Sequence, residues 1–378
     1  MKPLVFLLAA ALRVVFIGDP QADSPAEVEY ARQAIREVRD LKGIDLAVVL
    51  GDLVNDKPGL LDSLKASLDS LPFKWICCPG NHDRDIYHEK GKKRDMTTFR
   101  KVMGYTDTTF ILKGVRFISL DDVREGPNGY EGGLREDQKE WLDSVMAKTP
   151  KGMRTVVTCH IPLSEFQAKD SLATVFKNHR RVLAVCGHTH TVGRSTLELS
   201  DDVAFEQVLG GALCGSWWRG QKGEDGLPYS LMNCGAPRGW FLAEFSDRRD
   251  WYRLQYRCTG RDTDDQMSVR LRDGMLMVNV YGGSTEGRMY LVSGKRRIEI
   301  PRRALPAAEA MEVHEWNTGI GKSLRKTHKE LFIPILRMKS PHVWAAETDG
   351  ETLGGIPLEG AVIEYADKAM TVRREIRL

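Results

Sequence analysis

The stretch Cys186-Gly187-His188-Thr189-His190 decides how the rest of the chain is interpreted. The apolar run 182–185 precedes it, which predicts a buried strand that ends in a loop with two histidines. Residues i and i+2 of extended backbone point to the same side, so both imidazoles would face one site. Each would then bind one metal of a pair roughly 3.5–4 Å apart. Taken alone, two loop histidines that face water explain the stretch equally well.

Four other predicted strands also end in polar clusters. Apolar runs typical of buried strands lie at 13–17, 46–50, 73–78 and 154–158. Helices are predicted between the first three strands, at 24–43 and 59–71. This layout indicates an α/β sheet whose site lies beyond the carboxyl ends of its strands. The clusters that would meet there are Asp19-x-Gln21, Gly51-Asp52, Gly80-Asn81-His82-Asp83, His160 and the opening stretch.

Length and composition limit the possible classes of protein. A chain of 378 residues has room for two domains, or for one large domain with an addition. Its 42% hydrophobic and 28% charged residues are ordinary for a globular protein, so a buried core is expected. The net charge of +3 gives no indication of a nucleic-acid partner. No later stretch has the ~20 apolar residues that a transmembrane helix needs.

The N-terminus allows two interpretations. Lys2 followed by the apolar run 4–12 resembles a short signal peptide, which leads us to expect export to the periplasm or the cell envelope. The alternative is that the run extends the strand at 13–17.

The seven cysteines do not form a recognisable metal or redox motif. No Cys-x-x-Cys is present, which excludes zinc-ribbon and thioredoxin-type sites. Buried thiols are predicted where cysteines end apolar runs, at Cys77, Cys78, Cys159 and Cys186. A disulfide remains open among the three cysteines of loop-rich sequence, Cys214, Cys234 and Cys258.

The pattern changes around 259–265, and a domain boundary is predicted there. The expected domains are 12–260 and 265–378. Glycine-punctuated short strands are predicted in the second domain, at 275–281, 288–292, 296–300, 361–365 and 372–378. These segments indicate a small all-β domain.

The ordered clusters resemble the motifs of the calcineurin-like metallophosphoesterase superfamily: Asp-x-His, Gly-Asp, Gly-Asn-His-Asp/Glu, His and Gly-His-x-His. The resemblance covers residues 13–258 and implies an α/β fold, a four-layer α-β-β-α sandwich. Segments 211–218 and 340–344 resemble a bacterial, mostly exported branch with a small C-terminal all-β, sandwich-like domain.

The resemblance implies a dinuclear metal centre in which Asp52 bridges both ions. One ion would be held by Asp19, Gln21, Asp52 and His190, and the other by Asp52, Asn81, His160 and His188. Two carboxylates against two dications leave a net positive site that attracts phosphate. Oxygen and nitrogen ligands without thiolate suit two divalent metal ions such as Mn, Fe, Zn or Mg.

Gln21 departs from the superfamily, which usually has histidine at this position. An amide oxygen binds transition metals more weakly than imidazole does, so the ion on His190 is expected to be the one more easily lost. The alternatives are that a harder metal binds at this position, or that Gln21 does not coordinate.

The expected function is metal-dependent hydrolysis of a phosphoric ester, by a phosphomonoesterase or a phosphodiesterase. The resemblance implies attack by a hydroxide that bridges the metals on Asp52, with His82 as general acid for the leaving group. Either Asn55 or Asp56 would orient His82, and Asp83 and Asp121 would orient metal ligands.

The expected substrate is a small phosphorylated molecule. Residues predicted to form the wall of its pocket are Tyr130, Trp217, Trp218 and Arg219, with loop packing as the alternative for each aromatic residue. The basic run 88–94 would steer an anion, or simply face solvent.

Two further classes of function are less consistent with the sequence. A nuclease is disfavoured because the charge is near neutral and no basic surface with interleaved aromatic residues is visible. A non-catalytic protein that binds a glycan or a partner through the β domain, with a degenerate metal site, is disfavoured by the presence of His82, His188 and His190. The sequence does not determine the oligomeric state.

Overall fold

The computed structural model describes residues 11–87, 93–126, 129–167, 169–247, 251–320, 324 and 326–377. The signal-like segment before residue 11 and most of the basic run 88–94 therefore lie outside the described residues. None of the helices among the described residues combines the length and the apolar composition that a bilayer crossing needs.

The first sheet has the strand order β15-β14-β1-β2-β3. Its strands are β1 (Leu12–Ile17), β2 (Leu46–Val49), β3 (Lys74–Cys77), β14 (Gly239–Phe245) and β15 (Tyr252–Cys258). The first three are parallel, and β14 joins β1 antiparallel. Strands β1, β2 and β3 agree with the strands predicted at 13–17, 46–50 and 73–78.

The second sheet has the order β12-β13-β11-β10-β7-β6. Its strands are β6 (Thr108–Leu112), β7 (Val115–Ser119), β10 (Arg154–Cys159), β11 (Val182–Cys186), β12 (Val192–Ser200) and β13 (Val203–Gly210). The sequence analysis did not predict β12 and β13. In β12, Gly193 and a buried Arg194 interrupt the apolar pattern near its start, and buried and exposed positions alternate only towards its end.

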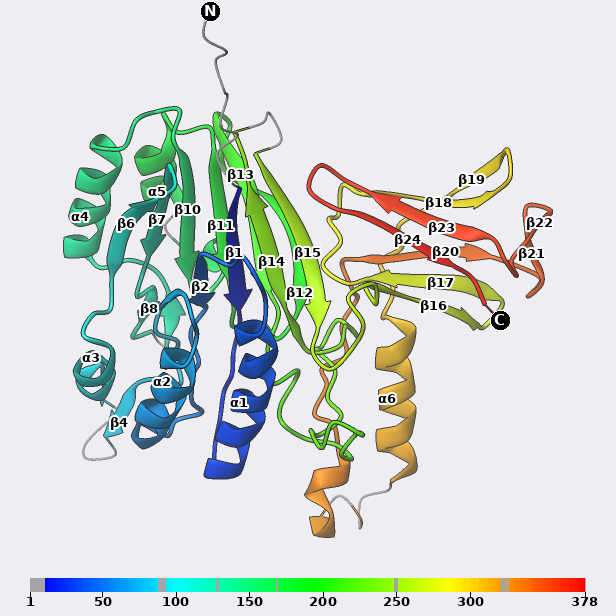
Figure 1. Ribbon diagram of the computed structural model, residues 1–378, viewed down its shortest axis with the longest axis horizontal. Helices are drawn as coiled ribbons and strands as arrows, with labels where there is room; N and C mark the ends of the chain where they lie inside the picture. The colour runs from blue at the N-terminus through cyan, green and yellow to red at the C-terminus, as the bar shows by residue number, and fades with distance from the viewer. Residues whose placement is uncertain are drawn as a thin grey trace, which may run out of the picture.

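The parallel strands have apolar side chains on both faces because each sheet is covered on both faces. In β10, Val156 belongs to the core between the two sheets, whereas Val157 belongs to the core under α4 (Glu136–Ala147) and α5 (Lys169–Phe176). Figure 1 shows α4 and α5 on the outer side of the second sheet.

Helices α1 (Pro25–Arg39) and α2 (Leu61–Asp69) pack on the first sheet, so the four-layer α-β-β-α prediction is confirmed. Helix α1 begins as predicted: the side chain of Ser24 accepts a hydrogen bond from the Glu27 backbone N–H at 3.3 Å, and Pro25 follows as the first helical residue. The shorter elements are β4 (Asp85–Tyr87), β5 (Lys93–Asp95), α3 (Thr97–Met103), β8 (Val123–Arg124) and β9 (Glu131–Gly132), with 3₁₀ turns at Pro58–Leu60 and Leu163–Glu165.

The C-terminal region contains two antiparallel sheets, ordered β16-β17-β20 and β19-β18-β23-β24. The five predicted strands correspond to β17 (Met275–Val280), β18 (Arg288–Ser293), β19 (Arg296–Ile300), β23 (Val362–Ala366) and β24 (Thr371–Glu375). The unpredicted elements are β16 (Met267–Arg272), β20 (Val343–Glu347), β21 (Thr352–Leu353), β22 (Ile356–Pro357), α6 (Ala308–Gly319) and the 3₁₀ turn Lys329–Leu331.

Helix α6 escaped prediction because it lacks a stripe of large apolar residues. The residues that it buries include Ala308, Ala310 and Val313, together with the polar Glu309 and Asn317. Strand β15 ends at Cys258 and β16 begins at Met267, while the exact division into domains 12–260 and 265–378 stays a prediction. All seven cysteines are free and buried, so the disulfide left open by the sequence is not formed.

A buried ion-pair network joins the C-terminal sheets to β12. The Arg194 guanidinium donates from Nε to the carbonyl of Gly282 at 2.8 Å, and it pairs with Glu206 at 3.5 Å and with Asp367. All three charged side chains are almost fully buried. Figure 1 shows the C-terminal sheets next to β12 and β15.

Arg194→Met should lower the free energy of unfolding by about 3–5 kcal/mol, because the buried Asp367 then loses its cation and Glu206 keeps only Lys368, at 3.7 Å. Denaturant unfolding followed by tryptophan fluorescence measures the change. The matched surface variant Arg377→Met, whose ion pair with Glu375 is exposed, should cost less than ~1 kcal/mol. Equal stabilities of Arg194→Met and wild type would contradict the assigned role.

Candidate metal centre

The polar clusters predicted at the strand ends lie together at the carboxyl ends of both sheets. Asp19 and Gln21 follow β1, Asp52 follows β2, and Asn81 follows β3. His160 follows β10, and His188 and His190 follow β11. Asp19, Gln21, Asp52, Asn81 and His160 are almost inaccessible to solvent. In Figure 1 the arrowheads of β1, β10 and β11 point towards the same end of the molecule.

The imidazole of His160 is the centre of the densest group. Its Nε2 lies 3.0 Å from Asn81 Oδ1, 3.2 Å from Asp52 Oδ2 and 3.2 Å from His188 Nδ1. Its Nδ1 lies 2.8 Å from the carbonyl of Leu50, which can only accept, so Nδ1 carries the proton. In the neutral ring, the lone pair of Nε2 faces other electron-pair donors, an arrangement that a cation bound between them would stabilise.

The electrostatics of this group agree with a cation site. Burial alone would lower the pKa of His160, but the neighbouring Asp52 carboxylate outweighs burial and raises that pKa to about 10. Burial opposes ionisation of Asp52, yet His160 holds the Asp52 pKa well below its usual range. Burial raises the pKa of Asp19 well above its usual range, although His160 acts in the opposite direction. These carboxylates thus attract positive charge at the position of Nε2.

A second, looser group surrounds His190. Its Nδ1 lies within 2.9 Å of the carbonyls of Gly215 and Ser216, which fixes the proton there, and its Nε2 lies 3.8 Å from Asp19 Oδ1. Gln21 is buried with its Oε1 3.7 Å from Cys214 Sγ. This donor set fits a metal ion less tightly than the set around His160.

Left-handed backbone positions these side chains. Positive φ angles occur at eight non-glycine residues of the described chain, and the five predicted metal ligands among them are Asp19 (39°), Gln21 (42°), Asp52 (49°), His188 (72°) and His190 (49°). Such conformations cost about 1–3 kcal/mol each and persist only where the surrounding fold enforces them. The assumption of extended backbone at His188 and His190 was therefore wrong, although both residues do line one pocket.

A glycine of the third cluster permits the close packing of two loops. A Cβ on Gly80 would lie 2.1 Å from Asp52 Oδ1, so only glycine fits beside this ligand. The Asp83 carboxylate accepts from the backbone N–H groups of Gly80 at 2.8 Å and Val54 at 3.1 Å, and thereby ties the same loops together.

Asp122 holds His160 in place. It accepts from the His160 backbone N–H at 2.9 Å, and burial raises its pKa to about 7. The sequence analysis had assigned an orienting role to Asp121, but this residue pairs with Arg84 at 2.6 Å instead. Sequence reasoning missed Asp122 because two adjacent aspartates after a strand give no sign of which one faces the site.

His82 lies beside the predicted metal ligands, and Asp56 holds its side chain. Its backbone N–H donates to Asp52 Oδ1 at 2.9 Å, and its ring Nδ1 lies 2.9 Å from Asp56 Oδ1. Burial lowers the pKa of His82, but Asp56 and Asp52 outweigh it and raise the pKa above its usual value. Of the two residues considered for orienting His82, the structure therefore selects Asp56 and not Asn55.

A pocket of about 600 Å³ opens over the ligands. Tyr130 and Trp217 line it. The Tyr130 ring packs edge-on against His188, with 5.7 Å between ring centroids. The Trp217 ring is tilted against His190, with 5.9 Å between ring centroids. Sequence reasoning missed several of its lining residues: Glu165, Thr189, Asn233, Phe332, Pro334, Ile335 and Leu336. Those beyond residue 330 lie far along the chain and carry no motif.

Trp218 and Arg219 do not belong to the described lining of this pocket. Trp218 is 5% exposed, and its indole N–H donates to the carbonyl of Pro20 at 2.7 Å, so it packs behind the β1 loop. Of the two adjacent tryptophans, Trp217 is the one in the described lining of the pocket, and a contact of Trp218 or Arg219 with substrate stays a prediction.

Comparisons with solved structures found chains of low sequence identity. One is a dimetal phosphatase from Danio rerio, with 15% identity and a TM-score of 0.49 over 66% of this chain and 97% of that chain. Another is PhoD, with 12% identity and a TM-score of 0.47 over 85% of this chain and 78% of that chain. GAP50, the anchor in the inner membrane complex of Plasmodium, has 16% identity and a TM-score of 0.42 over 67% and 86%. No curated protein matched the sequence.

Two family models match successive parts of the chain. Residues 12–192 match calcineurin-like phosphoesterase, and residues 208–354 match the C terminal of calcineurin-like phosphoesterase. Family members are phosphoester hydrolases that use divalent metal ions, in agreement with the donor atoms of Asp52, His160 and His188, which lie within 4.8 Å of one another. The chain therefore belongs to the calcineurin-like phosphoesterase family.

Proposed function

We propose that the protein hydrolyses small phosphoric esters, monoesters or diesters, at a centre of two divalent metal ions. The ligands would be Asp19, Gln21, Asp52 and His190 for one ion, and Asp52, Asn81, His160 and His188 for the other. The strongest support is the convergence of potential metal-binding atoms at His160 Nε2, where a carboxylate oxygen, an amide oxygen and a second imidazole nitrogen all lie within 3.2 Å.

Bound divalent ions neutralise the charge of a phosphoryl group and make water a nucleophile at neutral pH. Asp19 and Asp52 offset only part of the charge of two such ions, so the centre remains attractive to an anionic ester. Oxygen and nitrogen donors suit Mn, Fe, Zn or Mg. The left-handed loops fix the donor atoms before substrate arrives, which reduces the reorganisation required for binding.

His82 is placed to donate a proton to the leaving alkoxide. Asp56 accepts from Nδ1 of its ring, which leaves the ring's Nε2 for the substrate, and the raised pKa favours the protonated form of the imidazole. The ring is 27% exposed and lines the pocket, so it is accessible from the substrate side. Such proton transfer typically contributes about 10²–10⁴-fold.

Metal binding should raise the melting temperature of chelator-treated protein. At about 100 times the dissociation constant, Mn²⁺ should add ~5 °C, because binding to the folded state alone stabilises it. Titration should reveal a tighter and a weaker site, and Gln21→His should strengthen the weaker one, since imidazole binds transition metals more tightly than an amide. The ligand assignment would be contradicted by two sites of equal Mn²⁺ affinity, or by an Asp52→Asn variant that binds Mn²⁺ with wild-type affinity.

The loss of hydrolysis rate in His82→Asn should depend on the acidity of the leaving group. An alkyl leaving group needs a proton, so its hydrolysis should fall about 10²–10⁴-fold, whereas p-nitrophenolate departs without one and should be affected far less. Metal content, measured by plasma mass spectrometry, should stay at the wild-type level, and Asp56→Asn should show a weaker form of the same pattern. Loss of metal from His82→Asn would make His82 a ligand. No turnover and no metal in the wild type would favour a binding role.

Export is also proposed, because the segment before the first strand resembles a short signal peptide. Deletion of residues 2–10 should then retain the protein in the cytoplasm, while the full chain should appear in the periplasmic or envelope fraction. Recovery of both forms from the cytoplasm would contradict the proposed export.

A further inference from the structure

We propose that the preferred substrate is a phosphodiester with one apolar organic group, and that residues 331–340, here called the strap, form the wall that binds this group. The inference rests on the proposed function, because it names the substrate class of the same site. The strap lies between α6 and β20 in the sequence, and its residues Phe332, Pro334, Ile335 and Leu336 line the pocket over the proposed metal centre.

The pocket has two chemically distinct parts. Gln21, Asp52, His188 and His190 form the polar part, where the phosphoryl group would bind. The strap side chains form an apolar part, together with the aromatic rings of Trp217 and Tyr130. A ligand that fills both parts carries a phosphoryl group at one end and an apolar group at the other.

Leu336 is the clearest sign that something apolar binds here. It is 68% exposed, which makes it the most exposed large hydrophobic residue of the described chain. Its side chain does not serve the core, yet it lines the pocket beside charged groups. Covering such a side chain with an apolar ligand removes its surface from water and favours binding in proportion to the area covered.

The strap is held rigidly, which suits a preformed binding wall. Asn317 of α6 is buried and bonds both backbone groups of Ile333: its Nδ2 donates to the carbonyl at 2.7 Å, and its Oδ1 accepts from the N–H at 3.2 Å. Asn233 accepts from the Leu336 N–H at 2.9 Å, and its own backbone N–H donates to the His190 carbonyl at 2.9 Å. The strap is thus tied directly to a proposed metal-ligand loop.

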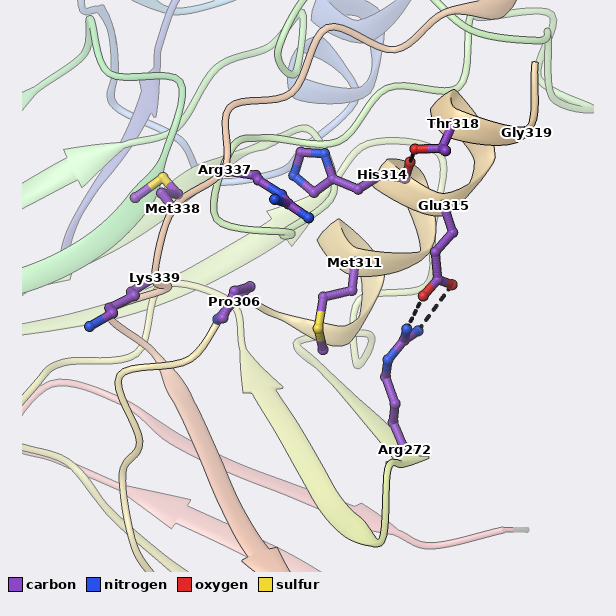
Figure 2. Close-up of a pocket in the computed structure, with 10 residues that line it drawn as sticks. All are labelled: Arg272, Pro306, Met311, His314, Glu315, Thr318, Gly319, Arg337, Met338 and Lys339. Carbon is purple, nitrogen blue, oxygen red and sulfur yellow. Dashed lines mark hydrogen bonds and ion pairs between the residues drawn. The ribbon is translucent and has the colours of Figure 1, made fainter. Parts of the chain in front are cut away.

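Cationic side chains of the strap face a different groove. Arg337, Met338 and Lys339 line a second groove of about 810 Å³ against α6, with Met311 and His314 on the opposite wall (Figure 2). In the described lining of the metal pocket there is no lysine or arginine, and Glu165 adds a carboxylate. Among the described lining residues the phosphoryl group would therefore meet no lysine or arginine besides the metal ions and His82, which favours a singly charged diester over a doubly charged monoester.

In the reaction, water adds to phosphorus and the bond to one ester oxygen breaks. His82 gives its proton to that oxygen and takes one back from solvent, to which the attacking water releases its own proton. The products are an alcohol and a phosphomonoester.

The test compares two diesters with the same leaving group, methyl p-nitrophenyl phosphate and hexyl p-nitrophenyl phosphate, on Mn²⁺-loaded full-length protein. Wild type should favour the hexyl ester in kcat/KM, and Leu336→Ser should reduce this preference by roughly tenfold. Leu271→Ser, a matched change at a leucine on β16 outside the pocket lining, should leave the preference intact. Equal rates for both esters in the wild type, or faster hydrolysis of p-nitrophenyl phosphate than of either diester, would overturn the proposal.

A binding measurement separates this inference from the proposed function. Calorimetric titration should show that hexylphosphonate binds more tightly than methylphosphonate, and that Leu336→Ser removes the difference. If no ester is hydrolysed but this difference in binding is found, the proposed function is wrong and the inference that the strap binds the apolar group is supported. If both diesters are hydrolysed at equal rates and both phosphonates bind equally, the apolar wall fails and the proposed function stands.

Discussion

The mutual repulsion of buried electron pairs is the constraint on which this site depends. Asp19 and Asp52 are carboxylates without access to water, and imidazoles and an amide oxygen surround them. Such a group is costly unless positive charge enters it. The sheets and the left-handed loops hold the group together, at the expense of backbone strain. Folding and cation binding are consequently coupled, since each stabilises what the other requires.

The fold and the members of the site were largely predictable because both depend on local chemistry. Runs such as 182–185 and 46–50 are apolar throughout, which is typical of strands covered on both faces, and glycine or aspartate follows them closely. Since the carboxyl ends of such strands meet, the polar residues that follow were expected together. The conformation of these residues was not predictable. His188 and Asp52 have positive φ angles. Contacts with segments far away in the sequence hold these conformations, and the conformational propensities of single residues carry no information about such contacts.

What sequence reasoning missed depends on tertiary contacts between distant segments. Helix α6 has small buried residues and one buried amide, Asn317, and neither resembles the apolar stripe that marks a helix. The structural role of Asn317 is to form two hydrogen bonds with the backbone of Ile333, and only the folded structure shows them. Similarly, Trp217 and Trp218 are equivalent in sequence, and the direction of the chain at that turn alone decides which ring reaches the pocket.

The order of these parts along the chain has an evolutionary consequence. Every proposed metal ligand precedes residue 191, whereas the apolar wall lies between residues 331 and 340. Chemistry and selectivity are thus encoded in separate stretches of the gene. Substitutions of the strap side chains would alter which molecules are accepted while every proposed metal ligand stays unchanged. Such an arrangement allows a lineage to diversify its substrates faster than its mechanism.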